Sequence, residues 1–164
     1  MTAPAVDCDI DPQWGDDADW AALASAAVAA AARVAPEIAH DHLEFSLVLA
    51  DDDEVAALNG EWRGKPRPTN VLSFPMLTRE GVLAAGVGPA PVMLGDVILA
   101  HGVCAREAEE KGIAIADHAS HLIIHGLLHL AGYDHETSDA DAAEMEDLER
   151  KALASLGLAD PYAG

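Results

Sequence analysis

The sequence lacks a secretory signal, a membrane-spanning run and a cysteine framework. Its N-terminus, MTAPAVDCDID, has neither the basic nor the apolar region of a signal peptide. The longest apolar run, ALASAAVAAAA, stops at Arg33 and is too short to cross a bilayer. The two cysteines, Cys8 and Cys104, lie far apart and form no CxxC pair. We therefore expect a soluble, cytoplasmic protein in a reducing compartment, with no membrane partner.

Basic residues are also scarce. The chain has 9 Lys and Arg against 29 Asp and Glu, and a formal net charge of −20 at pH 7. Because phosphate contacts come from Lys and Arg, this balance alone argues against nonspecific binding to nucleic acid. However, Arg63, Lys65 and Arg67 fall within five residues. A local basic cluster of this kind can still bind a phosphate.

Apolar residues, by contrast, are sufficient for one hydrophobic core. The 164 residues are 51% apolar, which suits a single domain spanning residues 1–164. The pattern predicts an irregular segment at 1–15 and an exposed turn at 78–91. Apolar periodicity predicts strands at 43–49, 71–74 and 92–100, and helices at 19–35, 51–62, 101–111, 117–131 and 139–156. This order predicts an α/β (α+β) fold, a single compact domain with a small mixed sheet and about five helices.

The segment HLIIHGLLHLAGYDH, residues 121–135, places histidines in an otherwise apolar helix. His125 and His129 are four residues apart and therefore project from the same helix face. Gly132 stands where a glycine ends a helix, so the chain can turn and bring His135 back towards them. Three imidazoles can hold a zinc ion and leave its fourth position to a water molecule, whose pKa the metal lowers. The spacing therefore predicts a catalytic metal centre with a zincin-like helix.

The ordinary alternative for any one of these histidines is a core residue with a hydrogen-bond partner. His121 shares the face of His125, and its role as a supporting partner is left open. Asp134 either orients a ligand imidazole through its other nitrogen or faces solvent in the turn. His118 is expected near the helix start and solvated. The remaining histidines belong to no group: His40, His42 and His101.

The histidine and glycine spacing also matches the HExxHxxGxxH pattern of metzincin proteases. In those enzymes the glutamate after the first histidine is the general base. Here that position is Gly126, so the metal-binding pattern is present while the peptidase base is missing. The sequence therefore disfavours a peptidase.

Two long motifs carry a resemblance to a known family. HGLLHLAGYDH and RGKPRPTNVLSFP, together with LGDVILA and the closing ADPY, resemble the YbeY family of bacterial endoribonucleases across residues 43–162. The resemblance implies a metal-dependent RNase specific for single strands. Such enzymes act in ribosome quality control and in maturation of the 3′ end of the small-subunit 16S rRNA. It also implies that His125, His129 and His135 hold one metal ion, usually zinc, and that Arg63 of the RGK motif is important for activity.

The basic loop agrees with this chemistry. The guanidinium fork of Arg63 can bind a phosphate or stabilise charge on its oxygens, although a solvated surface arginine is the alternative. Lys65 and Arg67 can position backbone phosphates. Hydrogen bonding to substrate and turn-capping explain three further residues equally well: Thr69, Asn70 and Ser73.

The acidic composition fits RNA binding less well. With three Trp, two Tyr and two Phe, no aromatic surface for stacking bases is evident. We therefore expect weak, salt-dependent RNA affinity, assisted by docking of acidic surface on basic proteins of the small ribosomal subunit. No DNA partner is expected.

The sequence thus predicts a zinc-dependent endoribonuclease, and two alternatives stay open. One is a metzincin-like hydrolase of another class, such as a peptidase, which the absence of the glutamate disfavours. The other is a non-catalytic ribosome-assembly factor with a structural metal. Three histidine ligands without cysteine disfavour it, because structural sites usually fill all four positions with protein ligands.

Overall fold

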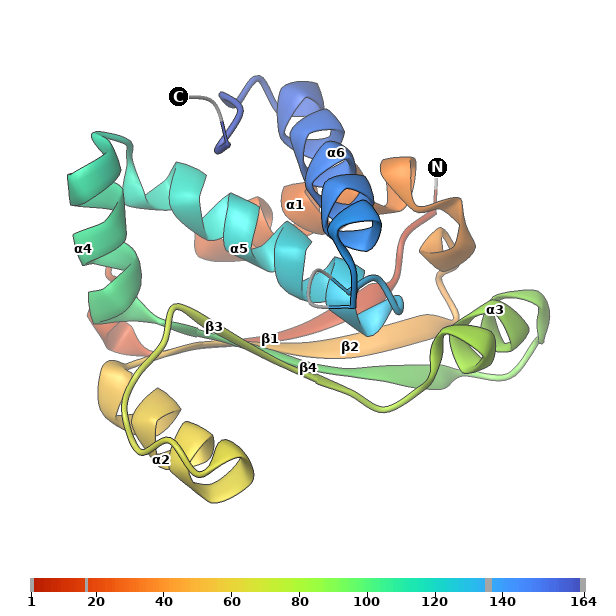
Figure 1. Ribbon diagram of the computed structural model, residues 1–164, viewed down its shortest axis with the longest axis horizontal. Coiled ribbons are helices and arrows are strands. Elements are labelled where there is room, and N and C mark those ends of the chain that lie inside the picture. The colour runs from red at the N-terminus through yellow and green to blue at the C-terminus, as the bar shows by residue number, and fades with distance from the viewer. Residues whose placement is uncertain (1, 17, 135–136, 163–164) are drawn as a thin grey trace.

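The computed structural model describes residues 2–16, 18–134 and 137–162, which form a single α/β domain around a four-stranded mixed sheet (Figure 1). The strand order is β1-β2-β4-β3. Strand β2 pairs in parallel with β1 and β4, and β3 is an antiparallel edge strand beside β4. The predicted small mixed sheet is confirmed. The strands are β1 (Ala5–Ile10), β2 (Leu43–Ala50), β3 (Val71–Pro75) and β4 (Val92–Ala100).

Helices cover the two faces of this sheet unequally. Figure 1 shows α1, α5 and α6 together on one face, whereas α2 lies alone beneath one end of the other. Among the described residues, no helix combines the length and apolar composition needed to cross a membrane. The α-helices of the described ranges are α1 (Trp20–Val34), α2 (Asp52–Arg63), α3 (Arg79–Val87), α4 (His101–Lys111), α5 (Ile115–Leu130) and α6 (Asp139–Ser155).

The main core lies between the sheet and α1, α5 and α6. Strand β2 alternates as predicted, and its Leu43, Phe45 and Leu47 are fully buried against these helices. A smaller apolar cluster on the opposite face packs Val55 of α2 against Ile98 of β4. The three-helix face is therefore closed by packing, while the α2 face is only partly covered.

Two segments differ from the sequence prediction. Residues 5–10 form β1 instead of an irregular segment, because backbone pairing with β2 holds a strand whose side chains alternate only between exposed and half-buried. The predicted turn at 78–91 contains α3. The Thr78 side chain caps this helix by accepting from Gly81 N, and Gly86 packs so closely that a Cβ there would lie 2.9 Å from Glu37 O. Capping and packing override the low helix propensity of glycine here.

Candidate metal centre

Helix α5 places His125 and His129 side by side. Their ring centroids are 4.8 Å apart, and the rings meet edge to face at 80°. Both residues are partly exposed, whereas their neighbours Leu127 and Leu128 are fully buried. The predicted shared helix face is confirmed, and it emerges from the core at the C-terminal end of α5.

The chain turns after α5 at the predicted glycine. Gly132 has φ +101°, and a Cβ on it would lie 2.9 Å from the Arg79 Cα, so glycine is required there. Gly132 N donates to His129 O at 3.0 Å. The third predicted ligand, His135, lies outside the described residues. Within the described part of the chain, no group of three or more His, Cys, Asp or Glu is arranged to hold a metal.

A buried carboxylate from α6 contacts two histidines of α5. Glu149 is 1% exposed, and its Oε1 accepts from His125 Nδ1 at 3.1 Å and from His121 Nε2 at 2.6 Å. The Tyr162 hydroxyl donates to the same oxygen at 2.9 Å. Burial alone would raise the pKa of Glu149, but the hydrogen bonds and charges of His121 and His125 lower it to about 2. Glu149 is therefore ionised and acts as an acceptor towards both rings.

This contact decides which nitrogen of His125 can coordinate a metal. An imidazole that donates Nδ1–H to a carboxylate coordinates through Nε2, and the carboxylate fixes the ring orientation and raises its basicity. Carboxylate–histidine pairs of this kind accompany most histidine-bound metals. The donor chemistry of His125 and Glu149 therefore fits a zinc ion.

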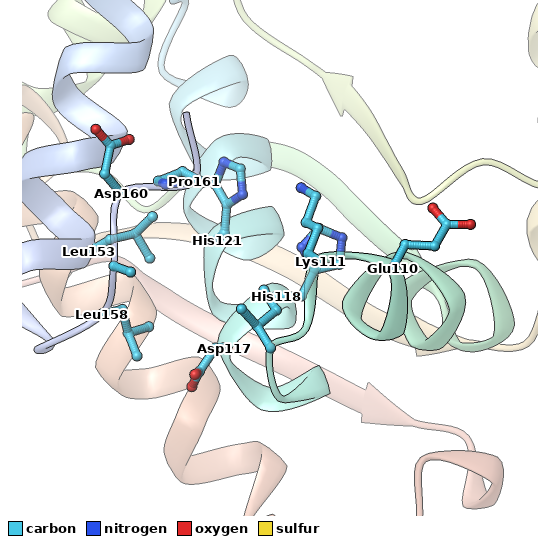
Figure 2. Close-up of a pocket in the computed structure, with 11 residues that line it drawn as sticks. Glu110, Lys111, Asp117, His118, His121, Leu153, Leu158, Asp160 and Pro161 are labelled. Carbon is cyan, nitrogen blue, oxygen red and sulfur yellow. The ribbon is translucent and has the colours of Figure 1, made fainter. Parts of the chain in front are cut away.

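The position of His121 is now defined. It shares the Glu149 oxygen with His125 and so acts on that histidine through the carboxylate. On its other side, His121 lines a cavity of about 460 Å³, together with Lys111 and the C-terminal Asp160 (Figure 2). The Asp134 side chain is exposed, which is compatible with both of the roles left open for it.

The expectation of a solvated His118 is wrong. The residue is 2% exposed, lines the same cavity, and its Nε2 bonds Glu107 Oε1 at 2.8 Å (Figure 2). Burial lowers the pKa of His118, and the Glu107 contact only partly offsets this. His118 is buried because α4 packs against the first turns of α5.

Gly126 has a structural reason to lack a side chain. A Cβ at this position would lie 2.6 Å from Val97 Cγ1 on β4. The space that a metzincin glutamate would need is occupied by the sheet, since α5 packs directly on β4. The packing of α5 on β4 therefore excludes a glutamate side chain at position 126.

Arg63, at the C-terminal end of α2, contacts the edge strand of the sheet. Its Nη2 donates to Ser73 O at 3.3 Å, and its guanidinium carbon lies 5.8 Å from the centre of the Phe74 ring. Helix α5 also packs against β3, so Arg63 and the histidine-bearing helix contact the same strand. Lys65 and Arg67 are exposed on the following loop.

One of the polar residues near this loop has a structural role. Asn70 donates through Nδ2 to Glu107 Oε1 at 3.0 Å, and its Oδ1 accepts from Val71 N at 2.7 Å. Both ends of the amide are therefore occupied within the fold. Of the two roles left open for Asn70, substrate binding and turn-capping, these contacts favour the structural role.

Glu149 and Tyr162 are the functional residues that the sequence prediction missed. Glu149 follows Met145 by four residues and precedes Ala152 by three, so it occupies the buried face of α6. A carboxylate on an apolar helix face was the available signal, because such a group requires a partner inside the protein. Tyr162 comes from the C-terminal ADPY segment and has no comparable signal.

Comparisons with known proteins identify the family of the chain. The family described as "Endoribonuclease YbeY" matches residues 10–157. The "Endoribonuclease YbeY" of Novosphingobium aromaticivorans is 66% identical over 164 residues, covering 99% of this chain and 98% of that protein. The protein of that name from Erythrobacter litoralis is 55% identical over 146 residues, covering 89% and 91%. A solution structure from Thermotoga maritima shares the fold, with a TM-score of 0.58, 21% identity and coverage of 98% and 99%.

Proposed function

Because the chain belongs to the YbeY family of endoribonucleases, we propose that it is a zinc-dependent endoribonuclease that cuts single-stranded RNA in maturation of the 16S rRNA 3′ end. The observation that carries the zinc proposal is the Glu149 carboxylate, buried at 1% and bonded to His125 Nδ1. An ionised carboxylate in the apolar interior is costly unless several donors surround it. Orientation of a metal-binding imidazole accounts for its presence.

In this proposal, His125, His129 and His135 hold one zinc ion, which supplies Lewis-acid activation of water when bound. Glu149 holds His125 in the tautomer that coordinates through Nε2, and His121 and Tyr162 keep the carboxylate in place. The site has no glutamate at position 126 to take a proton.

The arginine supplies the charge that phosphodiester cleavage requires. The guanidinium of Arg63 is held beside Phe74 and Ser73 and remains exposed, so it can bind a phosphate and stabilise negative charge on its oxygens. Arg63 contacts the edge strand β3 from the sheet face opposite α5, so in this proposal the RNA strand passes the β3 edge between Arg63 and the histidines. Lys65 and Arg67 then bind neighbouring phosphates.

The steric block at Gly126 argues against the peptidase alternative, since Val97 excludes the general base. Basic proteins of the small ribosomal subunit remain the proposed protein partners, with the cytoplasm as the site of action. The hypothesis of an assembly factor with a structural metal predicts metal binding without RNA cleavage. An experiment can therefore distinguish it from the endoribonuclease proposal.

The test is cleavage of a fragment carrying the 16S rRNA 3′ end, with zinc added at low salt. We expect cutting by wild type and none by His129→Ala, while His40→Ala, a histidine outside α5, retains activity. Circular dichroism and zinc content, measured on each protein, separate misfolding from loss of the metal.

Equal cutting by wild type and His129→Ala would indicate a contaminating RNase and contradict the proposal. Zinc bound by wild type without cutting, even with small ribosomal subunits present, would favour the assembly factor. Arg63→Lys keeps the charge but loses the fork, and we expect it to reduce cleavage without changing zinc content.

A further inference from the structure

An apolar groove lies on the sheet face that α2 only partly covers. It has a volume of about 480 Å³ and runs between the last turns of α2 and strands β3 and β4. Trp62 is 67% exposed and Met76 is 57% exposed, which is unusual for side chains of this size. The apolar lining of the groove consists of Leu58, Trp62, Phe74, Pro75, Met76 and Ile98.

Two aromatic side chains of the groove lie near each other, and one of them is largely exposed. The centroids of Trp62 and Phe74 are 6.4 Å apart at an interplanar angle of 58°, so the two rings are tilted and do not stack on each other. Phe74 is partly buried against the α2 cluster, whereas Trp62 stands out into solvent. Trp62 therefore offers indole surface on which a third ring can stack. Folding creates this aromatic site, which was not evident from the sequence.

Positive side chains lie at the rim of the groove, and one negative side chain lies in its lining. Arg63 lies 5.8 Å from the Phe74 ring at its rim, and Lys65 and Arg67 follow in exposed positions. In the described part of the chain, no carboxylate forms an ion pair with any of these three cations. Asp96, in contrast, lines the groove itself. Its carboxylate disfavours a phosphate inside the groove but can accept a hydrogen bond from an N–H on a base edge.

We propose that this groove binds an unpaired nucleobase of single-stranded RNA, stacked on Trp62, while the flanking phosphates contact Arg63, Lys65 and Arg67. The inference rests on the proposed function, because it assumes that RNA is the substrate. A cationic rim beside an exposed aromatic ring complements a nucleotide, which carries a flat apolar base and an anionic phosphate. Bases in a duplex cannot reach the indole, so the groove selects single strands.

The test measures binding of 2′-O-methyl oligoadenylate of about ten nucleotides to the zinc-loaded full chain. A second strand of equal length with abasic sugars keeps the phosphates but has no bases. Fluorescence anisotropy gives the affinities, and quenching of tryptophan emission reports stacking on Trp62, because Trp14 and Trp20 are 2% and 4% exposed.

For Trp62→Ala we expect binding of oligoadenylate to weaken between about 5- and 150-fold, with little change for the abasic strand. Trp62→Phe should retain most of the affinity. Val87→Ala, which truncates an 88% exposed apolar residue on α3, should bind as wild type. Lys65→Ala should weaken binding of both strands alike, because it contacts phosphate.

Unchanged oligoadenylate binding by Trp62→Ala would overturn the inference, as would an equal loss on the abasic strand. If Trp62→Ala instead abolishes self-association in sedimentation, the groove is an interface between copies and the inference is wrong. Either result leaves the proposed function intact provided that wild type cuts RNA. Wild type that neither binds nor cuts single-stranded RNA would end both proposals.

Discussion

Replacing Glu149 by glutamine should weaken zinc binding without unfolding the protein. Glutamine keeps the shape of the side chain and one carbonyl oxygen, so it can still accept hydrogen bonds at the position of Oε1. It removes the negative charge that His121 and His125 share at 2.6 and 3.1 Å. Loss of a supporting partner of this kind costs about 10- to 100-fold in metal affinity, or about 1.4–2.7 kcal/mol.

The alanine variant should behave differently. Glu149→Ala removes the acceptor of three donors, two of them histidines in partly or fully buried positions. Each buried donor that loses its acceptor costs about 1–3 kcal/mol of folding free energy. We therefore expect Glu149→Ala to lose thermal stability even without metal, whereas Glu149→Gln loses mainly zinc affinity.

Competition against a chromophoric chelator measures the zinc dissociation constant. Glu144→Gln is the matched control, since it makes the same substitution at an exposed position of α6. The expected loss of zinc affinity for Glu149→Gln is at least about ten-fold. A loss of no more than about two-fold would refute the argument that the carboxylate positions His125.

Three further changes have definite expected outcomes. Gly126→Ala forces a Cβ to 2.6 Å from Val97 Cγ1. The steric overlap should lower the free energy of unfolding, measured in urea, by about 1–3 kcal/mol, and the higher helix propensity of alanine should offset up to about 1 kcal/mol of that loss. Val97→Ala should cost less in that variant than in wild type. In the metal-free protein the pKa of Glu149 is lowered from 4.5 to about 2, so acid protonates the unfolded state first. The free energy of unfolding should therefore fall by up to about 3 kcal/mol from roughly pH 5 to pH 2, and Glu149→Gln should flatten this profile. Three phosphate contacts predict that log affinity for RNA falls with log salt at a slope of about −2, and Lys65→Ala should reduce it by about 0.7; an unchanged slope would exclude Lys65 from the RNA contact.

The sequence predicts the elements whose side-chain pattern is set by burial. Strand β2 and helix α5 have strong periodicity because one side of each packs on the core, and their bounds are nearly those expected. The prediction fails at β1 and α3. Strand β1 exists through backbone pairing with Leu43–Ala50, and α3 through a cap and a close glycine contact. Neither kind of contact leaves a clear hydrophobic pattern.

The same distinction applies to the site. The relation between His125 and His129 follows from local helix geometry, so the sequence predicts it. The contact with Glu149 joins α5 to α6 through tertiary packing, which the spacing of residues within either helix does not predict. The pairing of Trp62 with Phe74 likewise depends on how α2 folds over β3. Spacing along one helix identifies the candidate metal-binding histidines. The residues that orient them come from other elements, which only the tertiary fold brings close.

The net charge of −20 overstates the repulsion that RNA would meet at the groove. Several acidic side chains bind partners within the fold. Asp19 and Asp51 cap helices α1 and α2. Glu107 bonds His118, and Glu149 bonds His121 and His125. Each of these charges faces N–H donors that offset it locally. Acids farther away than about 8–10 Å are screened at physiological salt. Cations at residues 63–67 can therefore determine the local field, although the protein as a whole is acidic.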